Sequence, residues 1–433
     1  MLDRVFNFQD NAPWFTFLKL RGSWANVGKD TDPYALDQYY TATDYPGGFR
    51  PGATIPDPNI APENVATIEA GLEAKFLNNR IGFDVAVYQS DVTNQIYDVS
   101  NDYMSGAKYY TENIGLIRNR GIEIAATFVP VKTKDWNWTI NVNAARNVGV
   151  LKYMYEGWDN TQPHETDYGT YFGSAFYVYN YVGRQMGEIW GAKLMEKAPE
   201  GSYYLDADGN KVDCSGMYVI DPKTGYPKTT SEKRCVGNVN PDWTGGLSTS
   251  LRWKDLTLSM SFAAQLGGDT YSVTAAVLGQ QGKLTNTLEG RNDGLVAEGI
   301  NYANTDKDGK PIADENGGYL CSVNTTVCDN IYNYYKDYAA NRYNLEVYTF
   351  DTSFLKLKEL RLEYNFPKSL MAKQKVLQGV SLAGYATNVF CLTNYPFYDP
   401  EAGTMNGSSM LRGAEAGSYP MTRSYGFNLK LRF

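Results

Sequence analysis

The chain has 433 residues, of which 14% are aromatic, and its 48 acidic and 40 basic side chains give a formal net charge of −8. Such an aromatic composition can bury a core, which excludes a disordered chain. The acidic balance argues against a nucleic-acid partner, because nucleic acids are bound by basic surfaces. His164 is the only histidine, which excludes a two-histidine zinc site and leaves histidine-based catalysis only that one side chain.

Alternation of apolar and polar residues predicts ten β-strands. From Trp136 to Ala144, for example, every even position is apolar and every odd one is Asn or Thr. In chain order the predicted strands are 14–26, 65–77, 80–98, 108–129, 136–153, 242–253, 256–266, 350–366, 376–392 and 420–433. Most are longer than the roughly 5–6 residues of a globular strand, and they match the roughly 9–11 residues that a tilted strand needs to cross a bilayer.

Three local features modify this pattern. The alternation from Leu355 to Phe366 slips by one residue at Lys358 and Glu359, which predicts a β-bulge. The segment Tyr177–Leu194 is also strand-like, and a strand pair there would raise the total to twelve. The best candidate for a helix is a short one in a loop, over Ile331–Arg342.

Short turns and long loops alternate along the chain. Short connections fall at 78–79, 130–135, 254–255 and 368–375, and long ones at 27–64, 99–107, 154–241, 267–349 and 393–419. If the short turns share one side of a membrane, all the long loops lie on the other, as in outer-membrane barrels. The pattern therefore predicts an all-β fold, an antiparallel transmembrane β-barrel section of about 10–12 strands with long extracellular loops. A soluble β-sandwich, jelly roll or propeller also alternates, but loops of about 80 residues are uncommon in such folds.

Other membrane and targeting signals are weak. No run of 18 or more apolar residues occurs, so no transmembrane helix is expected. The first ten residues lack a basic stretch followed by an apolar one, so they are not expected to be a signal peptide. A mean hydropathy of −0.43 is typical of a soluble protein, although membrane barrels also score low because only alternate residues face lipid.

Several motifs follow one another in an order that is typical of one family. They are Leu18–Trp24, Asn78–Ile81, Asn113–Glu123, Gly237–Gly246, Phe354–Leu370, Ala386–Phe390, Thr393–Tyr395, Asp399–Glu401, Tyr419–Pro420 and Gly426–Phe433. Together they resemble the SusC/RagA family of TonB-dependent outer-membrane transporters, over nearly the full chain. The resemblance implies that residues 1–433 are the C-terminal part of a 22-stranded barrel, with the plug domain and the N-terminal strands absent.

The resemblance also implies a function and a set of partners. Members of this family import oligosaccharides or peptides, usually with a SusD-like surface lipoprotein as a lid, and they draw energy from the TonB complex. We therefore expect a bacterial outer-membrane nutrient importer with a periplasmic C-terminus, surrounded by outer-membrane lipid and requiring no cofactor. Two alternatives are a self-contained small outer-membrane pore or adhesin barrel and a soluble glycan-binding β protein.

Aromatic residues suggest two further roles. Phe433 ends an alternating strand, and in bacterial barrels such a terminal aromatic residue is read by the barrel assembly machinery. Most Trp and Tyr side chains suit the interfacial girdles of a membrane barrel. Loop tyrosines could instead stack on sugar rings of a ligand. The candidates are Tyr168, Tyr171, Tyr177, Tyr179 and Tyr181 in one loop, and Tyr332, Tyr334, Tyr335 and Tyr338 in another.

Cysteines and acidic turns complete the candidate sites. Because the cell surface is oxidising, two disulfides within loops are expected, Cys214–Cys235 and Cys321–Cys328. The turn sequences Asp206–Asn210 and Asp306–Gly309 lack the spacing of a calcium loop and are interpreted as hairpin turns, so no metal site is expected. No nucleophile or nucleotide-binding motif occurs in the required strand–turn–helix setting, and the sequence predicts no enzyme.

Overall fold

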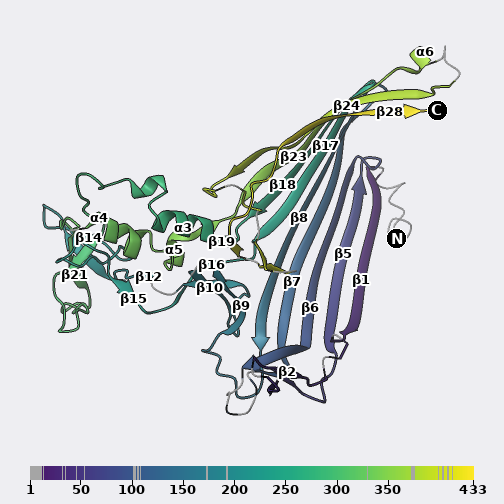
Figure 1. Cartoon of the computed structure of the whole chain (residues 1–433). Helices are drawn as coiled ribbons and strands as arrows, with labels where there is room; N and C mark the ends of the chain where they lie inside the picture. The colour runs from purple at the N-terminus through teal and green to yellow at the C-terminus, as the bar shows by residue number, and fades with distance from the viewer. Residues whose placement is uncertain are drawn as a thin grey trace.

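The dominant feature of the molecule is a tall, curved wall of antiparallel strands (Figure 1). The structure is a computed structural model. It describes residues 12, 14–31, 33–34, 36–44, 46–52, 54–100, 104, 107, 109–171, 174–191, 194–328, 330–371, 376–397, 399–401, 404–406, 409–411 and 413–433. The wall carries a separate group of small sheets and short helices at one of its ends.

Ten long strands build the wall in the order in which they occur in the chain. They are β1 (Phe15–Lys29), β5 (Glu63–Phe76), β6 (Ile81–Ser100), β7 (Tyr109–Lys132), β8 (Trp136–Tyr153), β17 (Trp243–Trp253), β18 (Leu256–Leu266), β23 (Phe354–Asn365), β24 (Gly379–Thr393) and β28 (Ser424–Arg432). Each of the ten corresponds to one predicted segment, so the predicted all-β fold is confirmed. A short strand, β4 (Thr54–Pro56), adds to β7 in parallel.

The wall is open. Its first and last strands are β1 and β28, and no pairing joins them in the described part of the chain. Each therefore has an edge whose backbone N–H and C=O groups need partners, which hydrocarbon cannot supply. This geometry does not favour the alternative of a small barrel that closes on itself.

The additional strand pair suggested by the sequence forms, but it does not join the wall. The segment Tyr177–Leu194 forms parts of β10 (Ser174–Asn180) and β11 (Glu188–Gly191), but both belong to a separate four-stranded sheet with β9 (His164–Tyr171) and β16 (Arg234–Asn238). A strand-like pattern is a local property, whereas membership of a particular sheet depends on which partner strand comes near it.

The two faces of the wall differ in polarity, as a two-residue period requires. One cross-strand row consists entirely of apolar residues and glycine: Leu72, Val85, Ile124, Ala144, Gly245, Ala264, Leu355 and Leu392. The row shifted by one residue faces the opposite side and is largely polar: Glu73, Asp84, Ala125, Asn143, Gly246, Ala263, Lys356 and Cys391. The outer face thus suits lipid, and the inner face suits water or protein.

The apolar outer face ends before the strands do. On β6 it runs from Ile81 to Val87 and is followed on the same face by Gln89 and Asp91. Arg118 of β7 forms an ion pair with Asp91 at 2.7 Å. At about 3.3 Å per residue the apolar stretch covers roughly 20 Å, close to the roughly 25 Å band of a membrane barrel. The loop ends of β6 and β7 therefore project beyond the hydrocarbon.

The short turns all lie at one end of the wall, where neighbouring turns are joined by hydrogen bonds. The N–H of Lys254 donates to the carbonyl of Asp135 at 2.6 Å, and the N–H of Asn365 donates to the carbonyl of Asp255 at 2.8 Å. The helix α6 (Lys368–Met371) lies in the turn between β23 and β24, and the C-terminus lies at this end (Figure 1). The predicted alternation of short turns and long loops is thereby confirmed.

The predicted β-bulge is also confirmed. The pairing of β23 with β18 and with β24 shifts between Leu357 and Glu359, so Lys358 is the extra residue. The predicted loop helix is present in part, because α4 (Ile331–Asn333) is followed by a π-helical turn over Tyr334–Ala339. Among the described residues, no helix is both long and apolar enough to span a bilayer.

The long loops fold into an assembly of small elements, which we call the loop assembly (residues 154–242, 267–353 and 394–423). Besides those already given, its elements are β12 (Leu194–Met195), β13 (Ser202–Leu205), β14 (Lys211–Asp213), β15 (Thr229–Thr230), β19 (Asp269–Ser272), α3 (Val273–Gln280), η2 (Thr285–Thr287), β20 (Ile300–Tyr302), β21 (Tyr319–Val323), α5 (Leu345–Tyr348), β22 (Thr349–Asp351), β25 (Thr404–Asn406), β26 (Ser409–Leu411) and β27 (Ala414–Glu415). The hairpin of β2 (Tyr40–Ala42) and β3 (Phe49–Pro51) lies in the loop before β5.

Candidate functional site

The loop assembly has a hydrophobic core of its own that joins its three loops. Ile189 from the first loop, Tyr271 and Tyr348 from the second and Ala414 from the third belong to one cluster of buried residues. Tyr271 and Ile189 are fully buried. Apolar burial stabilises a fold by roughly 25 cal/mol per Å², so these loops hold one another in place as a compact body at the end of the wall.

A buried carboxylate connects the third loop to the start of α3. Glu415 is 1% exposed and accepts hydrogen bonds from the hydroxyls of Ser272 at 2.7 Å and Thr274 at 2.8 Å. Ser272 is also the N-cap of α3 and accepts a hydrogen bond from the N–H of Ala275 at 3.1 Å. A carboxylate beside a helix N-terminus is favoured by the helix dipole, which explains why this acidic side chain is tolerated in the core.

Ion pairs also connect segments that are distant in sequence. Glu346 of α5 accepts hydrogen bonds from Lys197 and from Arg234, the latter at 2.8 Å. Burial raises the pKa of the Glu346 carboxyl, but these two cationic donors more than offset that effect and hold the pKa below its usual value. Glu346 is therefore charged at neutral pH and links the second loop to two positions in the first.

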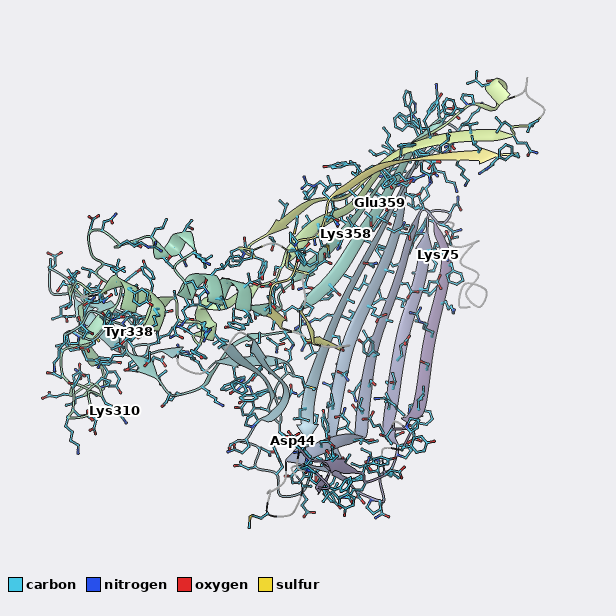
Figure 2. The ribbon with its side chains drawn as sticks, in the orientation of Figure 1. Asp44, Lys75, Lys310, Tyr338, Lys358 and Glu359 are labelled. Carbon is cyan, nitrogen blue, oxygen red and sulfur yellow. The ribbon has the colours of Figure 1, made fainter. Side chains whose placement is uncertain are left out.

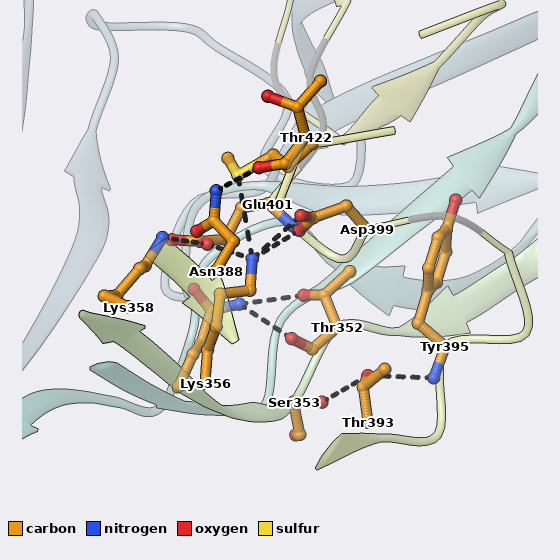
Figure 3. A network of polar contacts seen from close by, with 12 residues as sticks. Thr352, Ser353, Lys356, Lys358, Asn388, Thr393, Tyr395, Asp399, Glu401 and Thr422 are labelled. Carbon is orange, nitrogen blue, oxygen red and sulfur yellow. Dashed lines mark hydrogen bonds and ion pairs between the residues drawn. The ribbon is translucent and has the colours of Figure 1, made fainter. Parts of the chain in front are cut away.

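A buried network fastens the last long loop to the inner face of the wall (Figure 3). Lys356 of β23 is 2% exposed, and its Nζ lies 2.7 and 2.9 Å from the two carboxylate oxygens of Asp399. Glu401 accepts hydrogen bonds from both Lys356 and Lys358, the residue at the bulge. Both lysines, two residues apart on β23, therefore contact the same loop.

The inner face of the wall carries further charged and polar groups (Figure 2). Arg21 of β1 pairs with Glu69 at 3.5 Å and with Asp84 at 2.7 Å. These groups border a depression of about 570 Å³ that also reaches Glu123 and Asn143. Such a face suits contact with water or with a polar protein surface, and it is the opposite of the lipid-facing side.

The structure brings together three of the first group of predicted ligand tyrosines. Tyr179 is 5% exposed and its hydroxyl accepts a hydrogen bond from Lys233 at 2.9 Å. Tyr177 and Tyr181 lie beside it, with ring centroids 5.5 and 6.4 Å from that of Tyr179. Trp190 joins this cluster, with its ring centroid 5.0 Å from that of Tyr181. The side chains of Tyr168 and Tyr171, both on β9, lie outside the described part of the structure.

The second group of tyrosines divides into packed and exposed members. Burial raises the pKa of Tyr334 to about 12, and the ring packs against a cluster that contains Cys328. Tyr338 stacks on Tyr226 with ring centroids 4.8 Å apart. Tyr332, by contrast, is 66% exposed. Only some of the predicted tyrosines are therefore presented to a ligand.

Tyr332 and Tyr335 line a pocket in the loop assembly, a cavity of about 650 Å³ between α3, η2 and α4. The hydroxyl of Tyr335 donates to the carbonyl of Glu289 at 2.9 Å, which fixes that ring. The other polar groups that line the pocket are Gln280, Gln281, Thr287, Arg291, Asn330 and Lys336. An aromatic face beside amide and cationic donors is an arrangement that can bind a polar, hydroxyl-rich or carboxylate-bearing ligand.

The structure places the members of each predicted disulfide in different surroundings. Cys214 and Cys321 lie in one buried cluster, Cys328 lies in another, and Cys235 is an exposed residue of β16. The thiol of Cys328 donates to the carbonyl of Gly225 at 3.1 Å instead of joining Cys321. Spacing along the chain suggested neighbours within each loop, but the parallel pairing of β13 with β21 brings together cysteines from two different loops.

The two acidic turns are hairpin turns, as expected. Strands β13 and β14 pair across the turn at Asp206, whose carboxylate accepts the N–H groups of Asp208 at 3.0 Å and Asn210 at 2.8 Å. In the same way, the carboxylate of Asp306 accepts a hydrogen bond from the N–H of Asp308 at 2.9 Å. Within the described residues, no group of three or more His, Cys, Asp and Glu side chains is arranged to hold a metal ion.

The sequence matches the family model described as TonB dependent receptor-like, beta-barrel over residues 6–276, which is more than half of the chain. The chain belongs to this family of TonB-dependent receptor β-barrels. Family membership confirms the resemblance inferred from the sequence motifs and places the chain in the bacterial outer membrane. The family consists of transporters and receptors, not enzymes.

Individual relatives of this TonB-dependent receptor chain are distant but cover it almost completely. It is 24% identical over 448 residues to TonB-dependent receptor P3 of Formosa agariphila, with 99% of this chain and 40% of the relative covered. It is 24% identical over 463 residues to TonB-dependent receptor SusC of Bacteroides thetaiotaomicron, with 99% of this chain and 38% of the relative covered. The chain thus spans about 40% of the length of these relatives.

A solved transporter supports the same fold. The structure of the RagAB peptide importer in its open-open state superimposes with a TM-score of 0.66 at 20% identity, covering 99% of this chain and 41% of the other. At this identity the likeness concerns the fold alone. It agrees with an open wall of ten strands as one section of a larger receptor barrel.

Sequence reasoning missed how the functional groups combine. The segments with Lys356 and with Asp399 and Glu401 were both noted as motifs, but nothing in the sequence signalled that they pair with one another. The pocket was missed for a similar reason, because α3 and η2 were not predicted and the segment 280–294, which contains the end of α3 and all of η2, contributes about half of its lining. The only sequence signal for these contacts was the excess of polar residues in the loops, and that excess does not show which residues pair or line a pocket.

Proposed function

We propose that residues 1–433 are the C-terminal section of a SusC-like, TonB-dependent importer of oligosaccharides or peptides. The observation that carries this proposal is the open wall, which has an apolar outer face, a polar inner face and two unpaired edges. Such a wall needs further strands to complete a barrel. The share of its relatives that the chain spans, about 40%, supports the proposal that those strands, together with a plug domain, belong to a longer protein.

The arrangement of turns and loops supports an orientation. Short turns lie on the periplasmic side of outer-membrane barrels and long loops outside the cell. The C-terminus, at the turn end of this wall, is then periplasmic (Figure 1). The loop assembly faces the medium, where it is available to nutrients and to a SusD-like surface lipoprotein. The TonB complex acts from the periplasm through the N-terminal part of the longer protein.

The inner face is proposed to contact the plug, which the charged groups around Arg21 and Asp84 favour. Phe433 is proposed to be read by the barrel assembly machinery. It follows β28 directly and is 72% exposed, so the aromatic ring is accessible at the end of the last strand. Deleting Phe433 is expected to slow barrel assembly without changing the affinity of assembled receptor for its substrate.

The pocket beside Tyr332 is proposed as a contact for substrate in the loop assembly. Its exposed ring is suited to stacking, and the amides and cations around it are suited to hydrogen bonding. In the complete receptor, Tyr332→Ala is expected to weaken substrate binding by roughly 3- to 10-fold, as an aromatic contact of about 0.5–1.5 kcal/mol implies. Tyr419→Ala is the matched control, because Tyr419 is 93% exposed and lies in another loop away from the pocket. Equal losses in both variants would argue against a contact at this pocket.

The proposal as a whole is tested by the native protein. Its intact mass and N-terminal sequence should be measured after isolation from outer membranes, together with any lipoprotein that co-purifies. A species of about 2.5 times the 48.4 kDa of this chain, as a share of about 40% implies, with a plug segment, would support the proposal. A species of 48.4 kDa would exclude it and favour a protein whose wall is completed by a second chain. Deleting the gene should abolish growth on one oligosaccharide or peptide source.

A further inference from the structure

Two cysteines from different loops lie on either side of the same short strand. Cys214 directly follows β14, and its N–H donates to the carbonyl of Ser202 in β13 at 2.9 Å. Cys321 lies in β21, which pairs with β13 in parallel and sets Cys321 beside Tyr204. Strand β13 is therefore a template that brings the hairpin of the first long loop to the strand of the second.

The two side chains meet in the interior. Cys214 is 1% exposed and Cys321 is 4% exposed, and both belong to a cluster with Ala198, Val219 and Ile300. Each thiol is near enough to the other to affect its pKa. No described acidic or histidine side chain joins them in a metal-binding group, so their proximity is not explained by a metal site.

We propose that Cys214 and Cys321 form a disulfide that fastens the two longest loops of the assembly to each other. The chain is in the outer membrane, so it passes through the oxidising periplasm, where disulfides form and persist. The oxidant is a disulfide of a thiol–disulfide carrier. One thiolate attacks a carrier sulfur and forms a mixed disulfide, and the second thiolate then displaces the carrier. The two cysteines lose two protons and two electrons, and the carrier disulfide becomes two thiols.

Burial determines when this bond forms. Burial and the neighbouring thiol raise the pKa of Cys214 to about 12, and burial also raises the pKa of Cys321. Because the thiolate is the reactive species, exchange in the folded assembly is slow. The bond therefore forms while the loops fold, when both thiols are still accessible, and it is afterwards shielded from reductants.

The pairing is tested on the native protein from outer membranes. The protein is unfolded in guanidinium with iodoacetamide and without reductant, and it is then digested with trypsin. The expected product is peptide 212–223 joined to peptide 308–336, with Cys235 and Cys328 carrying the reagent. Reduction before alkylation should separate the two peptides and label all 5 cysteines. If both peptides carry the reagent unlinked without reductant, the proposal is refuted.

A pair of variants distinguishes the two cysteines of peptide 308–336. The cross-link should persist in Cys328→Ser and be lost in Cys321→Ser, although both variants change one cysteine of the same peptide. Loss of the cross-link in Cys328→Ser, or a link from 212–223 to 235–252, would overturn the proposed pairing. If Cys321→Ser does not assemble, the wild-type protein and Cys328→Ser together still decide the outcome. The result does not depend on transport, so failure of the importer proposal would be seen separately.

Discussion

Replacing Lys356 by Met should release the last long loop from the wall. The substitution keeps the length of the side chain but removes the charge that lies 2.7 Å from Asp399, which is 7% exposed. Breaking a buried ion pair by removing one partner costs about 3–5 kcal/mol, because the remaining charge is left without compensation. At about 1.4 kcal/mol per tenfold change, the opening of the loop from the wall should become roughly 100- to 3,000-fold more favourable.

Hydrogen exchange in the complete receptor measures this opening. The informative backbone amides are those of Tyr395 and Glu401, which donate to Thr393 and Asp399 at 3.0 and 2.9 Å. Their exchange should accelerate by the predicted factor in Lys356→Met. Amides of β6, far from the network, should exchange at the wild-type rate and serve as the internal reference.

Two matched variants sharpen the interpretation. Lys358 pairs with the same Glu401 but is partly exposed, and such pairs contribute about 0–1 kcal/mol, so Lys358→Met should accelerate exchange by no more than about 5-fold. In Lys356→Met combined with Asp399→Leu both buried charges are gone, and most of the protection of the Tyr395 amide should return. The Glu401 amide does not report in this double variant, because its acceptor is the Asp399 carboxylate. Equal exchange in Lys356→Met and Lys358→Met would refute the argument that burial makes this pair important.

Three further predictions concern the wall and the loop assembly. Gly245→Ala should destabilise the folded receptor by about 1–3 kcal/mol and so lower its unfolding temperature on heat-modifiability gels, because the new Cβ would lie 2.8 Å from a backbone carbonyl oxygen; Gly384→Ala, with open space, should not. Leu362→Arg on the lipid-facing side should destabilise the receptor by up to about 2–4 kcal/mol and so reduce the amount of assembled receptor in the membrane. Arg361→Leu on the inner face should have little effect. The pKa of Glu346 is lowered in the fold, so its ion pairs stabilise the loop assembly fully above the usual carboxyl pKa of about 4.3. This stabilisation is lost as the pH falls through the lowered pKa, and proteolysis of the loops should rise. Glu346→Gln should remove the part of that rise that is due to Glu346.

The wall could be predicted from the sequence because its cause is local. A strand that faces lipid on one side and water on the other must alternate, so residues such as those from Trp136 to Ala144 carry the pattern in themselves. The bulge at Lys358 was visible for the same reason, since one extra residue reverses the alternation. Motifs distributed along the chain then indicated the family, which the family match confirmed.

The loop assembly could not be predicted in the same way, because its contacts join residues that are far apart in sequence. Tyr177–Leu194 has the local pattern of a strand pair, but its partners are β9 and β16 and not the wall. Cysteine spacing suggested neighbours within each loop, yet the pairing of β13 with β21 selected Cys214 and Cys321.

The sequence by itself determined the ten wall strands, their two faces and the side on which the long loops emerge, because each depends on a period of two residues and on turn length. Only the tertiary structure decided which tyrosines are exposed, which cysteines meet and which carboxylates hold Lys356. The physical reason is that burial and ion pairing depend on the sum of many weak, long-range contacts, and a polar loop sequence is compatible with many such arrangements until its neighbours are in place.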